Sequence, residues 1–328
     1  MLARDRISLL KTMKILKFLA LTLAIVVVLI LLLLYEGDIP KDVIDARYSS
    51  PASQFLSLNE LGRIHYRDEG HRRSLPVVLL HGSNASLHTF EPWVEQLEGQ
   101  YRLITIDLPG HGLTGEIPSR DYSVASMISV IEQVVRQLKV DRFVIGGNSM
   151  GGDVALRYTL SHPDKIVGLV LIDASGTAIP ADIDKKANSI WGFSLVSKPW
   201  FRYIAKNIDP YYLIVQGLGI AYNHSPVVTD SLIMRYNDLT LRSGSRSAII
   251  DRSRTRGSED QPDLTKVKVP TLLMWGKEDA VIPFAFASAF ESSIPNVTTA
   301  YYDHVGHIPQ EEIPLQSAQD ISAFLGNL

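Results

Sequence analysis

Residues 146–152, GGNSMGG, place Ser149 among glycines directly after the apolar run DRFVI. A serine hydroxyl is a poor nucleophile near neutral pH, so a catalytic serine needs a base within hydrogen-bond reach and an acid that orients the base. Glycines on both sides permit a sharp turn that lifts the hydroxyl above a sheet. We therefore predict that Ser149 is a nucleophile on a strand-to-helix turn. The alternative is a serine that only allows the chain to bend.

Two histidines near the C-terminus are candidates for the base. His304 and His307 lie in HVGHIPQEEIP, which follows the apolar run VTTAYYD. Gly306 can turn the loop that precedes His307 toward the serine. We therefore favour His307 as the base and keep His304 as the alternative.

The orienting acid is expected at the end of another strand. Asp279 follows the apolar run PTLLMW in the loop GKEDAVIP, and the order serine, acid, histidine along the chain is then satisfied. Glu278 is its neighbour, and Asp173 ends the run VGLVLID at a second edge position. We predict Asp279 as the acid and retain Asp173 as the main alternative.

A developing oxyanion would need hydrogen-bond donors beside Ser149. The stretch VVLLHGSNAS ends a predicted strand, so the backbone N–H of Ser83 can point toward the serine, and the N–H of Met150 can supply a second donor. Such donors are worth about 3–4 kcal/mol each in a transition state. Asn84 and Asn148 are candidates for substrate contacts.

The elements that position these residues alternate between strands and helices. QFLSL and GRIHYRD alternate in the manner of two antiparallel strands, and five short apolar runs that end in Gly or Asp are typical of strands buried on both faces. Stretches with helical periodicity lie between these runs. The pattern predicts an α/β fold with a mostly parallel central sheet. The five runs are PVVLLHG, YRLITIDLPG, DRFVIGG, IVGLVLIDASG and PTLLMWG.

One segment interrupts this alternation. Between the sixth predicted strand and the PTLLMWG strand, residues 177–263 contain no clear strand, and we predict an inserted helical cap that shapes an apolar pocket at the carboxyl edge of the sheet. The arginines of LRSGSRSAIIDRSRTRG could bind an anionic substrate, but a solvated helix face is the favoured interpretation. The aromatic residues of the segment are Trp191, Phe193, Trp200, Phe201, Tyr203, Tyr211, Tyr212, Tyr222 and Tyr236.

The N-terminus has the pattern of a membrane anchor. Residues 18–34 carry no charge, and residues 15–34 reach about 30 Å as a helix, the thickness of a hydrocarbon core. We predict a basic cytoplasmic tail (1–14), a transmembrane anchor (15–35), a tether (36–52) and an α/β core (53–176 and 264–328). The basic side should stay in the cytoplasm, which places the body outside it, in the periplasm if the source is bacterial. A cleaved signal peptide is the alternative, but LLLLYEGDIP lacks a small-x-small cleavage pattern.

Composition excludes several classes of function. The 328 residues carry a net charge of −3; residues 1–17 account for +4, so the remainder carries −7. A mildly acidic body has no electrostatic footprint for nucleic acid. Cysteine is absent, which excludes disulfides and thiolate metal sites. We expect neither a metal ion nor a cofactor.

The motifs HGSNAS, DLPGHGLT, GGNSMGG, WGKEDAVIP and GHIPQEEIP, in this order, resemble the α/β-hydrolase fold family over residues 50–328. The resemblance implies Ser149 as nucleophile, His307 as general base and then acid, and Asp279 as its orienting carboxylate. Ser83 and Met150 would donate to the oxyanion.

A serine at this position implies acyl transfer to water, because dehalogenases and epoxide hydrolases of the fold attack with an aspartate. We therefore predict an esterase or lipase-like enzyme that cleaves small-molecule esters of largely apolar character. The main alternative is a carbon–carbon bond hydrolase, because the stretch GNSMGG is similar to the corresponding motif of those enzymes. Ile308 after the histidine and the HGSNAS loop depart from that pattern. A non-catalytic ligand-binding member of the family is a third hypothesis.

Overall fold

The computed structural model describes residues 2–177, 203–255 and 260–328. Eight strands form one sheet in the order β1-β2-β4-β3-β5-β6-β7-β8. β2 is antiparallel to β1 and β4, and all other neighbouring strands are parallel. The predicted fold class, a mostly parallel central sheet, is therefore confirmed. The strands are β1 (Ser53–Leu58), β2 (Gly62–Gly70), β3 (Pro76–Leu80), β4 (Arg102–Ile106), β5 (Phe143–Asn148), β6 (Ile166–Ile172), β7 (Thr271–Gly276) and β8 (Val297–Tyr302).

Continuous apolar runs form the central strands because both faces of the sheet are covered. In β3, Val78 and Leu80 enter one core cluster, whereas Val77 and Leu79 enter the other. All four side chains are fully buried. Burial of a side chain of this size contributes roughly 1.5–3 kcal/mol, so a run of four anchors the strand firmly.

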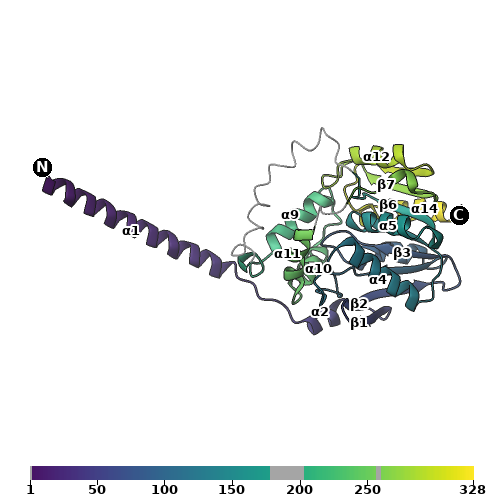
Figure 1. Cartoon of the computed structure of the whole chain (residues 1–328), viewed down its shortest axis with the longest axis horizontal. Helices are drawn as coiled ribbons and strands as arrows, with labels where there is room; N and C mark the ends of the chain where they lie inside the picture. The colour runs from purple at the N-terminus through teal and green to yellow at the C-terminus, as the bar shows by residue number, and fades with distance from the viewer. Residues whose placement is uncertain (1, 178–202, 256–259) are drawn as a thin grey trace.

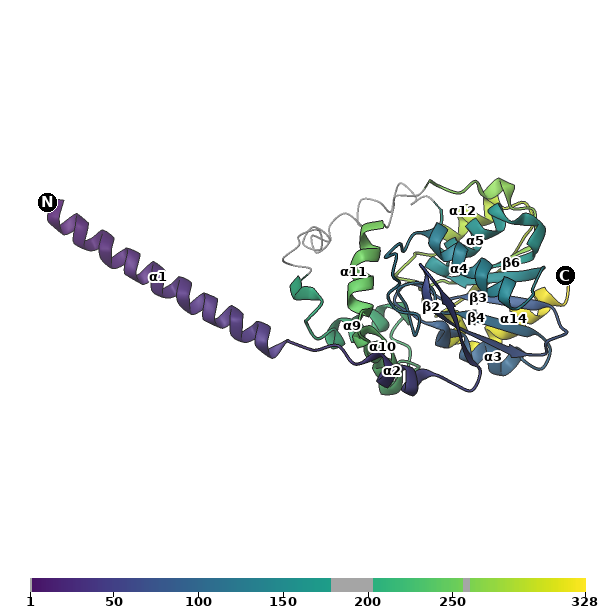
Figure 2. The same cartoon turned by 60° about the horizontal axis from the view of Figure 1, so that its bottom comes forward.

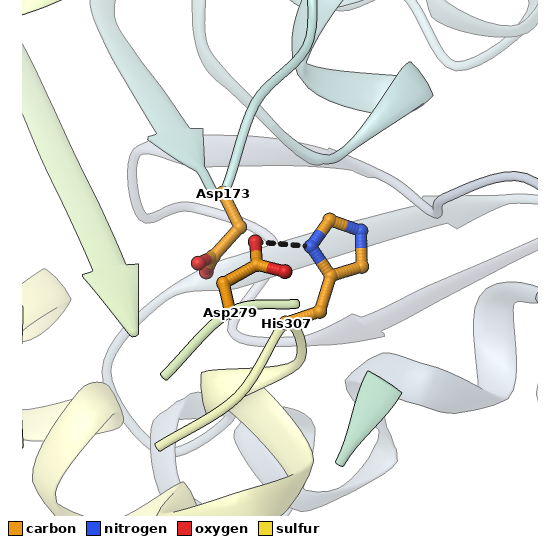
Figure 3. A group of neighbouring side chains, drawn as sticks. All are labelled: Asp173, Asp279 and His307. Carbon is orange, nitrogen blue, oxygen red and sulfur yellow. Dashed lines mark hydrogen bonds and ion pairs between the residues drawn. The ribbon is translucent and has the colours of Figure 1, made fainter. Parts of the chain in front are cut away.

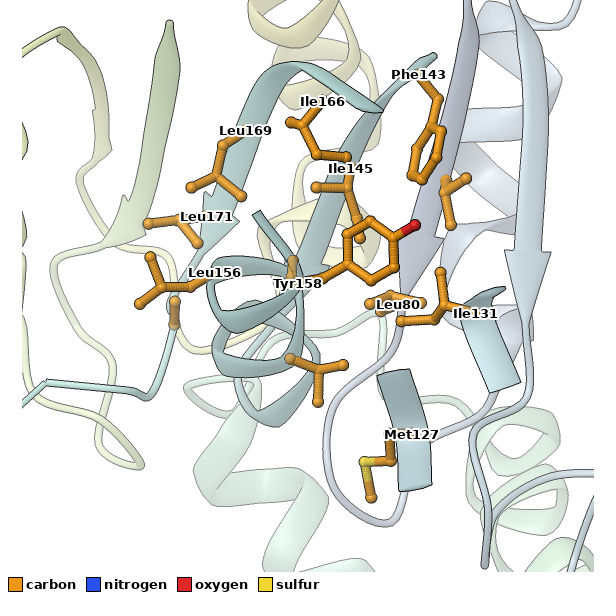
Figure 4. Close-up of a cluster of buried hydrophobic side chains, with 14 of the residues drawn as sticks. Leu80, Met127, Ile131, Phe143, Ile145, Leu156, Tyr158, Ile166, Leu169 and Leu171 are labelled. Carbon is orange, nitrogen blue, oxygen red and sulfur yellow. The ribbon is translucent and has the colours of Figure 1, made fainter. Parts of the chain in front are cut away.

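Helices pack on both faces of the sheet (Figures 1 and 2). One core cluster includes residues of α4 (Val124–Gln137), α5 (Met150–Ser161) and α12 (Ala285–Ser293); part of it is drawn in Figure 4. The other includes residues of α3 (Glu91–Leu97) and α14 (Pro314–Leu325). Short helical turns complete the core: η1 (Leu87–Phe90), η2 (Pro163–Lys165), η3 (Leu264–Lys266) and α13 (Pro309–Glu312).

The chain leaves the sheet after β6 and returns at β7, as predicted for an insertion after the sixth strand. The described part of this insertion contains α9 (Tyr211–Ala221), α10 (Asp230–Leu241) and α11 (Ser245–Thr255). These helices stand between the sheet and α1 in both views (Figures 1 and 2). Tyr222 is fully buried in an apolar cluster of the insertion. Four of the aromatic residues noted in the sequence, Trp191, Phe193, Trp200 and Phe201, lie outside the described residues.

The N-terminal helix α1 (Leu2–Leu33) extends away from the body (Figure 1). Its stretch Met13–Leu33 has a mean hydropathy of 3.0 and no buried part, and it is long and apolar enough to cross a membrane. Such a helix at the N-terminus fits a membrane anchor or a signal sequence.

The segment after α1 is not a loose tether. Residues 41–48 form the helix α2 (Lys41–Tyr48), whose Ile44 is fully buried. The Asp38 carboxylate pairs with buried Arg246 of α11 at 2.6 Å, and Glu36 N–H donates to the Asn207 carbonyl at 2.9 Å. The predicted tether therefore needs correction, because apolar and charged contacts fix this segment against the insertion.

Candidate active site

Ser149 occupies the turn between β5 and α5 in a strained backbone conformation, with φ 55° and ψ −119°. A non-glycine residue in such a region costs roughly 1–3 kcal/mol, and strain of this kind is concentrated at functional sites. The glycines of the motif are required by close packing. A Cβ on Gly147 would lie 2.2 Å from the Gly151 carbonyl oxygen, and a Cβ on Gly151 would lie 2.2 Å from the Leu80 carbonyl oxygen. Sheet, turn and helix can meet this closely only without those side chains.

The surroundings of Ser149 favour negative charge. It is the N-cap residue of α5, where the helix dipole and the unpaired amides are positive. The HGSNAS loop lies beside it, since a Cβ on Gly82 would be 3.2 Å from the Ser149 Cβ. Within the described residues, the amides of Ser83 and Met150 donate no hydrogen bond to the protein. Both are thus available as oxyanion donors.

His307 and Asp279 form a hydrogen-bonded pair in the loops after β8 and β7. His307 Nδ1 lies 2.6 Å from Asp279 Oδ2, and both side chains are almost fully buried (Figure 3). The other carboxylate oxygen of Asp279 accepts from the amides of Val281 and Ile282 at 2.7 and 2.9 Å. These bonds fix the position of the carboxylate. The carboxylate accepts a hydrogen bond from Nδ1 of the imidazole, and the lone pair on Nε2 is then available as the base.

Asn148 connects the serine turn to the histidine loop. Its side-chain amide donates to the His307 carbonyl at 2.9 Å and to the Ile172 carbonyl at 3.2 Å. Between Ser149 and His307 themselves, the described contacts include no hydrogen bond. Catalytic hydrogen bonds are often long before substrate binds, so Asn148 is the link that keeps the two residues on one edge. The predicted substrate contact of Asn148 stays a prediction.

Glu312 holds the histidine loop, and the sequence did not single it out. Its carboxylate accepts from Gly306 N–H at 2.9 Å and from Ile308 N–H at 3.1 Å, one on each side of His307. The His307 amide donates to the Ala221 carbonyl of α9 at 2.7 Å. The only signal in the sequence was a glutamate pair shortly after the histidine.

Asp173, the alternative acid, lies beside Asp279 (Figure 3). It is fully buried, and its Oδ1 accepts from Gly276 N–H at 2.9 Å. Burial, together with the charge of Asp279, raises the pKa of Asp173 well above its ordinary value. A carboxyl with a raised pKa ionises less readily and is the poorer partner for an imidazolium. Asp279, in contrast, is hydrogen-bonded to His307 at 2.6 Å, so the geometry favours Asp279 for that role.

Asp173, Asp279 and His307 each offer a ligand atom within 4.8 Å of the others. In this arrangement the His307 Nδ1 position is taken by the hydrogen bond to Asp279, and the remaining Asp279 oxygen is taken by two amides. The group is therefore described best as a hydrogen-bonded His–Asp pair with a second buried carboxyl beside it. The expectation that the chemistry needs no metal stays a prediction.

Three other histidines near the predicted motifs, His304, His81 and His111, differ in burial. His304 is exposed and lies in a left-handed turn at φ 63°. His81 and His111 are buried, and burial lowers the pKa of both imidazoles. Neither is bonded to Ser149 or Asp279 among the described contacts, which agrees with a structural role.

The prediction of a solvated arginine face was wrong for the three arginines whose side chains the structure describes, Arg242, Arg246 and Arg252. Arg242 and Arg246 are buried and pair with Asp45 and Asp38 at 2.8 and 2.6 Å. Arg252 contacts the HGSNAS loop through Ser83 Oγ at 3.0 Å and Asn84 Oδ1 at 2.6 Å. The charges had partners far away in the chain, which helical periodicity could not reveal.

Comparison with known proteins places this geometry in a family. A family model described as the alpha/beta hydrolase fold matches residues 76–207. The chain has the α/β-hydrolase fold, and the family model and the relatives support its likeness to lipase- and esterase-like members of that family. Its relatives and structural neighbours are lipases, esterases and other hydrolases, and the protein is a hydrolase.

Among the relatives, Lipase 1 of Psychrobacter immobilis is 26% identical over 275 residues, which covers 82% of this chain and 82% of that lipase. A 2-hydroxy-6-oxononadienedioate/2-hydroxy-6-oxononatrienedioate hydrolase of Escherichia coli O139:H28 (strain E24377A / ETEC) is 27% identical over 278 residues, 79% of this chain and 91% of that enzyme. The solved structure of a membrane phospholipase A matches with a TM-score of 0.70 at 22% identity, over 96% of this chain and 98% of that one. The last likeness is one of fold.

Proposed function

We propose that the protein hydrolyses carboxylic esters through an acyl-enzyme on Ser149. His307 Nε2 takes the hydroxyl proton as Ser149 attacks the ester carbonyl, and the Ser83 and Met150 amides stabilise the oxyanion. The imidazolium, held by Asp279, then gives its proton to the leaving alcohol. A water molecule activated by His307 releases the acid and restores the serine.

One observation carries this proposal: a strained serine at a helix N-terminus lies on the same sheet edge as a buried His–Asp pair. The loops of His307 and Asp279 follow β8 and β7, and Ser149 follows β5. Asn148 ties these loops together through the His307 carbonyl. The lipase and esterase names among the relatives support the same chemistry.

The apolar surroundings of the base favour apolar acyl groups. Ile308, next to His307, belongs to a buried cluster with Leu218, Leu232 and Ile233 of the insertion. An acyl chain that enters beside the base therefore meets hydrocarbon rather than charge. We expect esters of short to medium acyl chain to be turned over best.

Carbon–carbon bond hydrolysis is the second candidate, because 2-hydroxy-6-oxononadienedioate/2-hydroxy-6-oxononatrienedioate hydrolases are among the relatives, at 25–27% identity. Such an enzyme must hold a dianionic substrate and a ketonised intermediate, which calls for placed cationic groups around the histidine. The apolar Ile308 at that place favours esters instead.

The deciding experiment uses the full chain in detergent and two substrates. p-Nitrophenyl esters of graded chain length are assayed beside a dienone diacid, with Ser149→Ala as the blank. Ester turnover that is lost in the variant and unaffected by EDTA supports the proposal. Diacid cleavage with ester turnover a hundredfold poorer would reject it in favour of the second candidate.

We further propose that α1 stays attached as a single-pass anchor, with the catalytic body outside the cytoplasm and the membrane as its partner. The positive charge of residues 1–17 supports this orientation. The full chain should pellet with membranes and resist carbonate extraction, and protease should digest the body only from the outer side. A soluble chain that begins after residue 35 would indicate a cleaved signal, and digestion from the cytoplasmic side would reverse the orientation.

A further inference from the structure

Arg252 of α11 reaches from the insertion onto the HGSNAS loop. Its guanidinium donates to Ser83 Oγ at 3.0 Å and to Asn84 Oδ1 at 2.6 Å. It also contacts the ring of His111 in the loop after β4. One side chain of the insertion is thus bonded to two loops at the carboxyl edge of the sheet.

The hydrogen bonds of His111 make it an acceptor for this guanidinium. Its Nδ1 lies 2.9 Å from the Pro109 carbonyl oxygen, so the proton resides on Nδ1 and Nε2 carries the lone pair. Burial, and next the charge of Arg252, lowers the pKa of His111 well below its ordinary value. A neutral His111 therefore anchors Arg252 on its core side, and the guanidinium has a fixed place from which to hold the loop.

The loop itself has little regular structure to fix it. Residues 81–86 lie between β3 and η1, outside any helix or strand, and Asn84 has a positive φ of 62°. The Ala85 amide donates to the Gly82 carbonyl at 3.2 Å, and farther along the Leu87 amide donates to Asp107 at 2.8 Å. Between these bonds, Arg252 supplies the side-chain contacts to Ser83 and Asn84.

We propose that Arg252 is a positioning residue for the oxyanion donor: it holds the loop so that the Ser83 amide is aimed at the position of the oxyanion. This inference rests on the proposed function, because it assigns the Ser83 amide to the transition state. Donors of this kind act only when they are already in place as charge develops. Loss of Arg252 should therefore lower kcat more than it changes KM.

The test compares Arg252→Gln and Arg252→Lys with Asp251→Asn in the full chain. Asp251 is the preceding residue of α11 and pairs with the exposed Arg120 at 3.4 Å, so its variant controls for a general disturbance of the helix. We expect Arg252→Gln to lower kcat about tenfold, with KM changed less than about threefold, since loss of a whole oxyanion donor costs about 10²- to 10³-fold. Arg252→Lys should recover part of the loss, and Asp251→Asn should match the wild type. An equal loss in Asp251→Asn, or a rise in KM with kcat unchanged, would overturn the inference.

A double-mutant cycle with Asn84→Ala separates positioning from simple destabilisation. If Arg252 acts through the loop, Arg252→Gln should cost less in the Asn84→Ala background than in the wild type, because the shorter of its two loop contacts is already broken. Independent effects that multiply would contradict the inference. Binding of a trifluoromethyl ketone, which forms a tetrahedral adduct, should weaken in parallel with kcat.

Labelling of Ser149 by a fluorophosphonate distinguishes this inference from the proposed function. Absence of labelling in the wild type would remove the proposed nucleophile itself. Labelling of the wild type together with an equal rate in Arg252→Gln would leave the nucleophile in place and reject the role of Arg252. Slower labelling of Arg252→Gln, whatever the natural ester, supports the inference.

Discussion

Among the residues that the structure describes, two arrays of serine, histidine and aspartate stand out, and the one with more hydrogen bonds is not the candidate active site. Ser53 Oγ lies 2.8 Å from His65 Nε2, and His65 Nδ1 lies 2.7 Å from Asp107 Oδ2. The array of Ser149, His307 and Asp279 has the His–Asp bond but no hydrogen bond from the serine. If the number of hydrogen bonds were the only criterion, the Ser53 array would be chosen as the candidate active site.

The backbone separates the two arrays. Ser53 begins the strand β1, and its hydroxyl accepts from Ser50 N–H at 3.0 Å. His65 is fully buried and stacks on Phe55 at 4.9 Å between ring centroids. Ser53 lies neither on a strained turn nor at a helix N-terminus. The backbone around it therefore does not offer the unpaired amide donors that would stabilise an oxyanion. Ser149 has both, and we infer that nucleophilic catalysis depends on the placement of the serine backbone more than on a complete hydrogen-bond chain.

The sharpest way to break the comparison is to remove each serine hydroxyl. Ser149→Ala should lower ester turnover by about 10⁴-fold or more, because the nucleophile is lost. Ser53→Ala should leave turnover within about twofold and cost about 1 kcal/mol of stability for the lost hydrogen bond. Turnover and urea unfolding of both variants test this. Phosphonate labelling at Ser53, or a loss of activity in Ser53→Ala with the fold intact, would contradict it.

Substitution of the two aspartates, Asp279 and Asp173, should give the next largest difference in kcat. Asp279→Asn should lower kcat about 10³- to 10⁴-fold, since the amide favours the wrong histidine tautomer. The matched control is Asp173→Asn, beside Asp279, where an amide replaces a buried carboxyl whose pKa is raised well above its ordinary value; kcat should stay within a few fold. The reverse pattern would make Asp173 the acid.

The pKa of Asp173 adds a stability readout to the same pair. A carboxyl whose pKa is raised on folding contributes stability below its unfolded pKa and loses it as pH rises toward the folded value. Above that window the wild type bears the cost of an ionised, buried carboxylate. Asp173→Asn should therefore gain stability relative to the wild type as pH rises from 4 to 8. A difference in unfolding free energy that does not change with pH would contradict this.

Local patterns were enough to predict the sheet and the candidate triad. Apolar runs that end in Gly or Asp identify parallel strands, and the carboxyl ends of such strands meet at one edge. Asp279 and His307 follow two of these strands, so the prediction that they lie together needed no side-chain geometry. Ser149 was predicted from the glycines on both sides of it. The structure shows why they are glycines: a Cβ on Gly147 or Gly151 would clash with neighbouring backbone.

Partners that are distant in the chain could not be predicted in this way. Arg242 pairs with Asp45, which is 197 residues away, and a helical pattern contains no information about such a partner. Glu312 acts through backbone amides, which leave no trace in residue types. The Ser53 array depends on the register of β1 against β2, which the alternating pattern does not specify.

The last prediction concerns how the free energy of unfolding depends on pH through His88, a buried histidine near Asp107 of the Ser53 array. His88 donates from Nε2 to the Tyr48 carbonyl at 2.9 Å and accepts at Nδ1 from Ser86, and burial lowers its pKa to about 4, against 6.5 when exposed. The unfolded chain therefore binds a proton more readily between pH 6.5 and 4, and the folded state loses stability as pH falls through that window, by roughly 2 kcal/mol on reaching pH 5.

Gln cannot take up this proton, so His88→Gln should lose about 2 kcal/mol less than the wild type when urea unfolding is compared at pH 7.5 and pH 5. The variant can be less stable at both pH values without affecting the comparison, because the prediction concerns the change with pH. An equal loss of stability in His88→Gln and in the wild type would mean that His88 takes up a proton in the folded state as readily as in the unfolded chain, and that its burial does not lower its pKa.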